Sequence, residues 1–132
     1  MEPMHNQSAG LRAELGSRPV IVAAGLAGAV GVMAAAGASH AGESRNLSAI
    51  AMICLAHGPA LLALGLLGRG RVLGLASALL AFGTILFAAD LAVREWLGHG
   101  VFVGAAPLGG AGMICGWFMV IAAGVMPRPF SK

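Results

Sequence analysis

The stretch GRVLGLASALLAFGTILFA, residues 70–88, decides the fold that this sequence predicts. Small residues recur along it in alternating steps of four and three, at Gly70, Gly74, Ser77, Ala81, Thr84 and Ala88. A helix with this spacing is apolar all round and carries one shallow groove, which in lipid seats a neighbouring helix. The stretch therefore predicts a membrane-spanning helix that packs closely against another helix.

The composition of the whole chain supports a membrane protein. Of the 132 residues, 58% are hydrophobic and 10% are charged, whereas about a quarter are charged in soluble domains. About 20 apolar residues cross a bilayer core, and four runs fit: residues 19–38, 49–67, 72–93 and 108–126. We expect an all-α polytopic membrane protein of four antiparallel transmembrane helices in a compact bundle. Polar tails at residues 1–18 and 128–132 flank it.

The placement of basic residues predicts the orientation of the chain. The eight Lys and Arg residues are scattered, so a nucleic-acid partner is not expected. With four spans, one side holds Arg12, Arg18, Arg69, Arg71, Arg128 and Lys132, and the other holds Arg45 and Arg94. The positive-inside rule then predicts both termini in the cytoplasm, or on the equivalent side of an organelle membrane. Of these locations we expect a bacterial inner membrane, with both termini cytoplasmic. A cleaved signal ending near Ala36 and Ala38 is the weaker interpretation, because the apolar run exceeds a typical signal core.

Two other predicted spans carry small residues at helical spacing. In residues 19–38 these include Gly28 and Gly31, and in residues 108–126 they are Gly109, Gly112 and Gly116. Such faces allow helix backbones to approach closely. We expect the helix at residues 19–38 to pack backbone to backbone against the helix at residues 72–93.

His57 lies near the middle of the second span and is the sharpest candidate for a functional residue. A polar ring at this depth is costly and is by default a functional hypothesis. The structural interpretation is a neutral histidine bonded across helices, or bonded near the Leu55 carbonyl that Pro59 frees. The alternatives are a proton or ligand role, or ligation of a metal or haem.

Asp90 and Arg94 form the second candidate, near the outer end of the third span. An Asp and an Arg four residues apart on a helix attract each other, so an ion pair at the membrane rim is expected. The functional alternative is a small polar cluster at this outer side, which His40, Glu43 and Arg45 would join.

The sequence contains no nucleophile elbow, P-loop, HExxH or CxxC pattern. We therefore expect no enzyme, no cofactor and no metal site. The first hypothesis is a small interaction or accessory subunit, whose partners are the lipid bilayer and other membrane subunits or further copies of itself. A permease or proton-linked carrier that uses His57 is the second hypothesis. A redox-cofactor-binding subunit is the third and weakest.

Several short motifs carry a resemblance to a known family. They are GASH at residues 37–40, HGPALL at 57–62, GTILF at 83–87, PLGG at 107–110 and GW at 116–117. Together they resemble the bacterial YgdD-like membrane proteins, a family of unknown function with a mitochondrial transmembrane relative. The resemblance covers nearly the whole chain after residue 18. It implies four membrane spans and no established activity.

Overall fold

The computed structural model describes residues 4–40, 42 and 44–127, and in this part of the chain all regular structure is helical. There are four helices: α1 (Met4–His40), α2 (Arg45–Leu67), α3 (Arg71–Leu97) and α4 (Ala105–Val125). Each holds a segment long and apolar enough to cross a membrane, which in α1 is Arg18–His40. The prediction of an all-α fold with four candidate spans is therefore confirmed.

The boundaries of the helices differ in places from the predicted spans. α1 begins at Met4, inside the segment expected to be a polar tail, and continues through Pro19 as one helix. α3 continues beyond residue 93 to Leu97. α4 begins at Ala105, so Pro107 lies in its first turn, where a missing N–H breaks no helical hydrogen bond.

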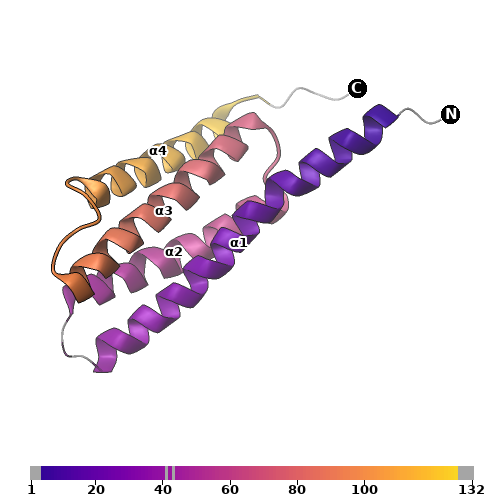
Figure 1. Ribbon diagram of the computed structural model, residues 1–132. Helices are drawn as coiled ribbons and strands as arrows, with labels where there is room; N and C mark the ends of the chain where they lie inside the picture. Colours follow the sequence, from indigo (N-terminus) through magenta and orange to yellow (C-terminus); the bar gives the residue numbers. More distant parts are fainter. Residues whose placement is uncertain (1–3, 41, 43, 128–132) are drawn as a thin grey trace.

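The helices run alternately in opposite directions (Figure 1). The start of α1, the end of α4 and the α2–α3 connection lie at one end, and the other two connections lie at the opposite end. α1 packs mainly on α2 and α3 mainly on α4, so the molecule consists of two helical hairpins. Contact between α2 and α3 joins the hairpins. Among the described residues, the backbone of α4 packs only against α3.

Glycines set the distance between the helices of the first hairpin. A Cβ atom at Gly58 would lie 3.3 Å from the backbone nitrogen of Gly28. A Cβ atom at Gly65 would lie 2.8 Å from Cγ1 of Ile21. Backbone therefore rests almost directly on backbone, which is the contact that small residues make possible between membrane helices.

The second hairpin is packed more tightly still. A Cβ atom at Gly83 would lie 2.6 Å from the carbonyl oxygen of Gly109, and one at Gly109 would lie 2.8 Å from the carbonyl oxygen of Gly83. Farther along, a Cβ atom at Gly116 would lie 2.7 Å from Cγ of Leu80. Any side chain at these positions would push α3 and α4 apart.

The expected close packing of α1 on α3 is wrong. These two helices have far less contact with each other than each has with its hairpin partner. The reason is steric and topological. Short connections place consecutive helices side by side. Glycines bring the backbones of these neighbours into contact, whereas Ala81 and Ala88 on α3 each carry a Cβ atom, which keeps a facing helix farther away.

Candidate functional site

His57 is buried in α2, where one of its ring nitrogens is fixed by its own helix. The side chain is 7% exposed, and Nδ1 lies 2.9 Å from the carbonyl oxygen of Ile53. A carbonyl oxygen only accepts hydrogen bonds, so Nδ1 carries the hydrogen. The expected partner near Leu55 is thus replaced by the carbonyl one turn back.

The other ring nitrogen of His57 is bonded across the bundle. Nε1–H of Trp117, on α4, donates to Nε2 of His57 at 3.2 Å, and the two rings meet edge to face with centroids 5.9 Å apart. Because the indole N–H only donates, Nε2 is an acceptor and the imidazole is neutral. The His57–Trp117 pair therefore links α2 to α4, two helices whose backbones are not neighbours.

Trp117 is the residue of this pair that the sequence alone did not single out as polar or functional. A signal existed. An indole N–H inside a membrane span needs an acceptor, and His57 is the other polar ring at comparable depth. Because both ring nitrogens of His57 are bonded, the pair behaves as a cross-helix clamp in this arrangement.

Asp90 is fully buried near the end of α3. Its Oδ2 atom accepts a hydrogen bond from Nε of Arg94 at 2.7 Å, which is the expected ion pair four residues apart. Its Oδ1 atom accepts the backbone N–H of Val101 at 2.7 Å. The carboxylate therefore serves as the attachment point of the α3–α4 connection as well as the partner of Arg94.

The larger outer cluster is not assembled in the described part of the chain. His40 and Arg45 are exposed, and neither is joined to Asp90 or Arg94 there. Glu43 lies outside the described residues. A different polar contact ties this end of the molecule: Nδ2 of Asn46, at the start of α2, donates to Oε2 of Glu95 at 3.0 Å.

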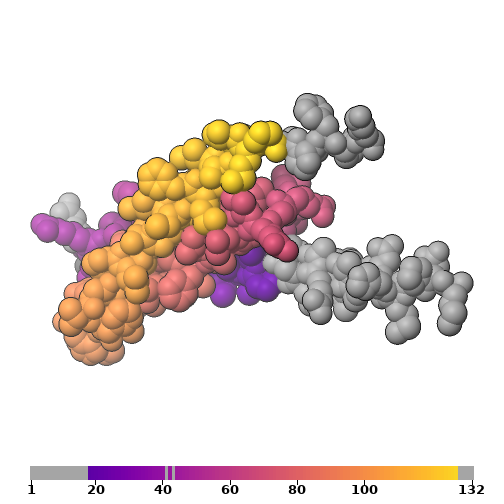
Figure 2. Space-filling model, turned by 90° about the horizontal axis from the view of Figure 1, so that it is seen from above, coloured from indigo at the N-terminus to yellow at the C-terminus, as the bar shows by residue number. Residues whose placement is uncertain are grey.

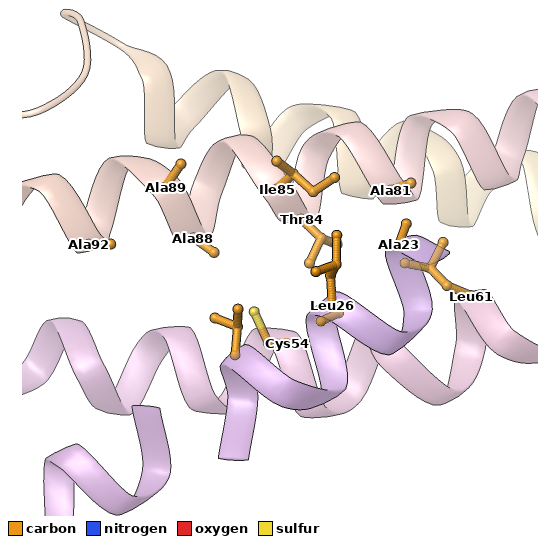
Figure 3. Close-up of a pocket in the computed structure, with 12 residues that line it drawn as sticks. Ala23, Leu26, Cys54, Leu61, Ala81, Thr84, Ile85, Ala88, Ala89 and Ala92 are labelled. Atoms are coloured by element: carbon orange, nitrogen blue, oxygen red, sulfur yellow. The ribbon is translucent and has the colours of Figure 1, made fainter. Parts of the chain in front are cut away.

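An apolar groove lies between α1 and α3, with α2 as its floor (Figure 3). We call it the α1–α3 groove. Its volume is about 310 Å³. α1 contributes Ala23, Leu26, Ala27 and Val30, α2 contributes Cys54 and Leu61, and α3 contributes Ala81, Thr84, Ile85, Ala88, Ala89 and Ala92.

The groove follows the helices for about three turns. Its α3 wall runs from Ala81 to Ala92, which at 1.5 Å per residue is about 16 Å. Thr84 is the one hydroxyl-bearing residue in the lining, and among the described residues its Oγ1 atom is buried without a hydrogen-bond partner. Part of the predicted small-residue face of this helix, from Ala81 to Ala88, thus borders the groove, and at its base Ala88 is buried against residues of α1 and α2.

The residues expected to mediate helix packing have three kinds of surroundings. A Cβ atom at Gly31, Gly109, Gly112 or Gly116 would meet the neighbouring helix, whereas one at Gly28 would meet nothing within 4 Å, although the backbone of Gly28 faces Gly58. Ser77 is buried, with its hydroxyl donating to the carbonyl of Leu73 at 2.7 Å, while Ala81 and Thr84 line the groove. The last kind is Gly70 and Gly74, where a Cβ atom would meet nothing within 4 Å. Gly58, Gly65 and Gly83 were missed, although glycine allows closer approach than any residue that carries a Cβ atom.

Comparison of the chain with family models, with curated proteins and with solved structures finds no match. The function is therefore inferred from the residues and geometry of this chain alone.

Proposed function

We propose that this protein is a non-enzymatic interaction or accessory subunit of a membrane complex, and that the α1–α3 groove seats a transmembrane helix of a partner. The observation that carries the proposal is the groove itself. It is apolar and about three helical turns long, and six of its twelve lining residues are alanines. Small residues at helical spacing let a second helix approach closely enough for extensive van der Waals contact.

The hydrogen bonds that His57 and Asp90 make within the chain support a non-enzymatic role. Both ring nitrogens of His57 are bonded within the chain, and both carboxylate oxygens of Asp90 are bonded as well. A proton-linked carrier or a haem-binding subunit would need a free nitrogen on His57. Either alternative would first have to break the His57–Trp117 pair.

The proposed location is a bacterial inner membrane with both termini in the cytoplasm. The start of α1 and the end of α4 lie at the same end as the α2–α3 connection (Figure 1), which holds Arg69 and is followed by Arg71. Basic residues favour the cytoplasmic side of a membrane. Membership of the YgdD-like family stays a prediction.

The first experiment fills the groove. In Ala92→Leu the added side chain would occupy one end of the α1–α3 groove, and in the control Ala111→Leu it lies on the exposed face of α4. Each variant is purified from its native membrane in mild detergent, with helix content checked by circular dichroism. We expect the partner to be lost from Ala92→Leu and retained by Ala111→Leu. Equal recovery with both variants would contradict the proposal.

A second experiment identifies what occupies the groove. A photoreactive side chain replaces Leu26, which lines the groove, and a matched one replaces Phe118, which is exposed on α4. Irradiation of native membranes should join position 26, but not position 118, to a different membrane protein. An adduct with a second copy of this chain, or with lipid alone, would rule out a helix of a different membrane protein as the occupant.

A further inference from the structure

The connection between α3 and α4, residues 98–104, exposes large apolar side chains at one end of the molecule. Val101 is 49% exposed, Phe102 is 47% exposed and Val103 is fully exposed. Beside them, at the end of α3, Trp96 is 71% exposed and Leu97 is 64% exposed. Five large apolar side chains exposed within residues 96–103 are typical of an interaction surface.

The charge pattern distinguishes the α3–α4 connection from the α1–α2 connection, which lies at the same end of the molecule. Residues 96–127 contain no Asp, Glu, Lys or Arg, and His99 is their one ionisable side chain outside Cys115. By contrast, the sequence between α1 and α2 is polar, with Glu43 and Ser44 followed by Arg45 and Asn46. Figure 2 shows residues 98–104, in orange, as a rounded lobe at one end of the molecule. One connection is thus suited to water and the other to an apolar surrounding.

Asp90 holds the apolar connection in place. Its Oδ1 atom accepts the N–H of Val101, and a Cβ atom at Gly100 would lie 2.6 Å from both Oδ1 of Asp90 and Nη2 of Arg94. The backbone at residues 100–101 therefore rests on the Asp90–Arg94 pair. With the backbone fixed there, the side chains of residues 101–103 remain on the outside.

The backbone hydrogen bonds fit a position at the membrane boundary. The N–H of Gly98 donates to the carbonyl of Arg94 at 3.1 Å, and the N–H of Ala105 donates to the carbonyl of Phe102 at 3.2 Å. Irregular backbone is tolerated against lipid only where its polar groups find partners or water. Asp90 lies nineteen residues after Arg71, about 28 Å along the helix, which is close to the thickness of a bilayer core of about 30 Å.

We propose that Trp96, Leu97 and residues 101–103 form an interfacial anchor, which inserts into the boundary between lipid headgroups and acyl chains. The occupant is lipid because residues 96–127 carry no Asp, Glu, Lys or Arg, so the patch continues into the exposed apolar surface of α4 without an intervening charge. Tryptophan also favours this boundary, where its ring is in an apolar layer and its N–H meets water. Asp90 is the positioning residue of the anchor. This inference is independent of what the α1–α3 groove binds.

The test measures the depth of the connection in vesicles. Val103→Cys is made in a Cys54→Ala, Cys115→Ala background, labelled with a nitroxide and reconstituted into phosphatidylcholine vesicles. The control label is at Arg45→Cys, which lies at the same end and is exposed. Collision of each label with oxygen, which partitions into lipid, is compared with collision with a water-soluble nickel chelate by electron paramagnetic resonance.

We expect the oxygen-to-nickel collision ratio to be several-fold higher at position 103 than at position 45. Equal ratios at the two positions would place the connection in water and overturn the inference. Loss of collision with both reagents at position 103 would show that protein covers it, which also overturns the inference.

Two further variants test the part assigned to Asp90. Asp90→Ala removes the acceptor of the Val101 N–H and should lower the ratio at position 103 toward that at position 45. Asp90→Asn keeps an acceptor oxygen, so it should retain most of the ratio. An unchanged ratio in Asp90→Ala would show that Asp90 does not position the anchor. If Asp90→Ala does not fold, the ratio with Asp90 intact still decides whether the anchor exists.

Discussion

Gly74 and Gly83 lie on the same helix, yet only Gly83 lies at a contact between two helix backbones. A Cβ atom at Gly83 would lie 2.6 Å from the carbonyl oxygen of Gly109 and 2.8 Å from the backbone nitrogen of Met113. A Cβ atom at Gly74 would meet nothing within 4 Å. The spacing rule selected Gly74 because it counts small residues at steps of three and four, whereas the contact depends on what faces the glycine across the bundle.

Gly83→Ala should destabilise the protein by about 1–3 kcal/mol, because the methyl group meets backbone atoms that cannot move without separating α3 from α4. Gly74→Ala is the matched control on the same helix and should be neutral or slightly stabilising, since alanine favours helix by up to about 1 kcal/mol. Unfolding of the detergent-solubilised protein by denaturing detergent measures both. Equal effects of the two substitutions would contradict the packing of α3 on α4 described above.

The polar residues could be selected from the sequence because polar groups are rare in the spans, and Arg94 could be predicted as the partner of Asp90 four residues before it, but the partners farther along the chain could not. His57 and Asp90 stand out because each interrupts a long apolar run. Trp117 lies 60 residues from His57 and Val101 lies on a connection with no regular periodicity. Which of these groups meet is determined by how the helices are rotated against one another, and that rotation depends on contacts between hairpins.

The His57–Trp117 hydrogen bond should contribute measurably to stability. Trp117→Phe keeps an aromatic ring and removes the N–H donor, and we expect a loss of about 0.6 kcal/mol, with an upper value of about 1.7 kcal/mol, as for other hydrogen bonds between membrane helices. A double-mutant cycle with His57→Phe isolates the coupling between the two side chains. Trp96→Phe, at an exposed position, is the control and should change stability little. Zero coupling would show that the pair does not clamp α2 to α4.

At the scale of helices, the end of α3 and the start of α4 depend on two glycines with left-handed backbone conformations. Gly98 follows α3 with φ 74°, and its N–H donates to the carbonyl of Arg94. Gly104 precedes α4 with φ 92°. Residues with a Cβ atom adopt this conformation at a cost of about 1–2 kcal/mol. These glycines therefore give the connection its path past Asp90.

Gly98→Ala should destabilise the protein by about 1 kcal/mol or slightly more, because alanine resists the left-handed conformation at the end of α3. Gly110→Ala is the control, since Gly110 is inside α4 and a Cβ atom there would meet nothing within 4 Å. Thermal unfolding followed by circular dichroism measures both variants. A neutral Gly98→Ala would show that α3 ends for another reason.

The sequence was sufficient to locate the helices but not to pair them. A long uncharged run identifies a membrane span whatever its neighbours are, because the thickness of the bilayer sets the length of the span. Which helices pair depends on which of their faces fit together most closely. α3 has two such faces: Gly83 lies on the face against α4, and Ala81 and Ala88 lie on the face toward α1. Gly83 allows the backbone of α4 to approach more closely than alanine would, so α4 packs on that face of α3. The face with Ala81 and Ala88 is left beside the α1–α3 groove.

At the scale of the whole molecule, two hairpins lie side by side and leave their outer surfaces apolar. Exposed large apolar residues occur on every helix, among them Met33, Met52, Phe82 and Phe118. In water such surfaces would drive aggregation, whereas in lipid they are solvated. The account therefore depends on the four helices crossing a bilayer in alternating directions.

Labelling of single cysteines from one side of a sealed membrane tests this dependence most directly. Arg18→Cys, Arg45→Cys and Arg69→Cys are made in a chain without Cys54 and Cys115, and treated with a maleimide that cannot cross the membrane. Arg18 and Arg69 lie at one end of the molecule and Arg45 at the other. The account predicts that positions 18 and 69 react from the same side, and that position 45 reacts only from the opposite side. Reaction of positions 45 and 69 from the same side would contradict it.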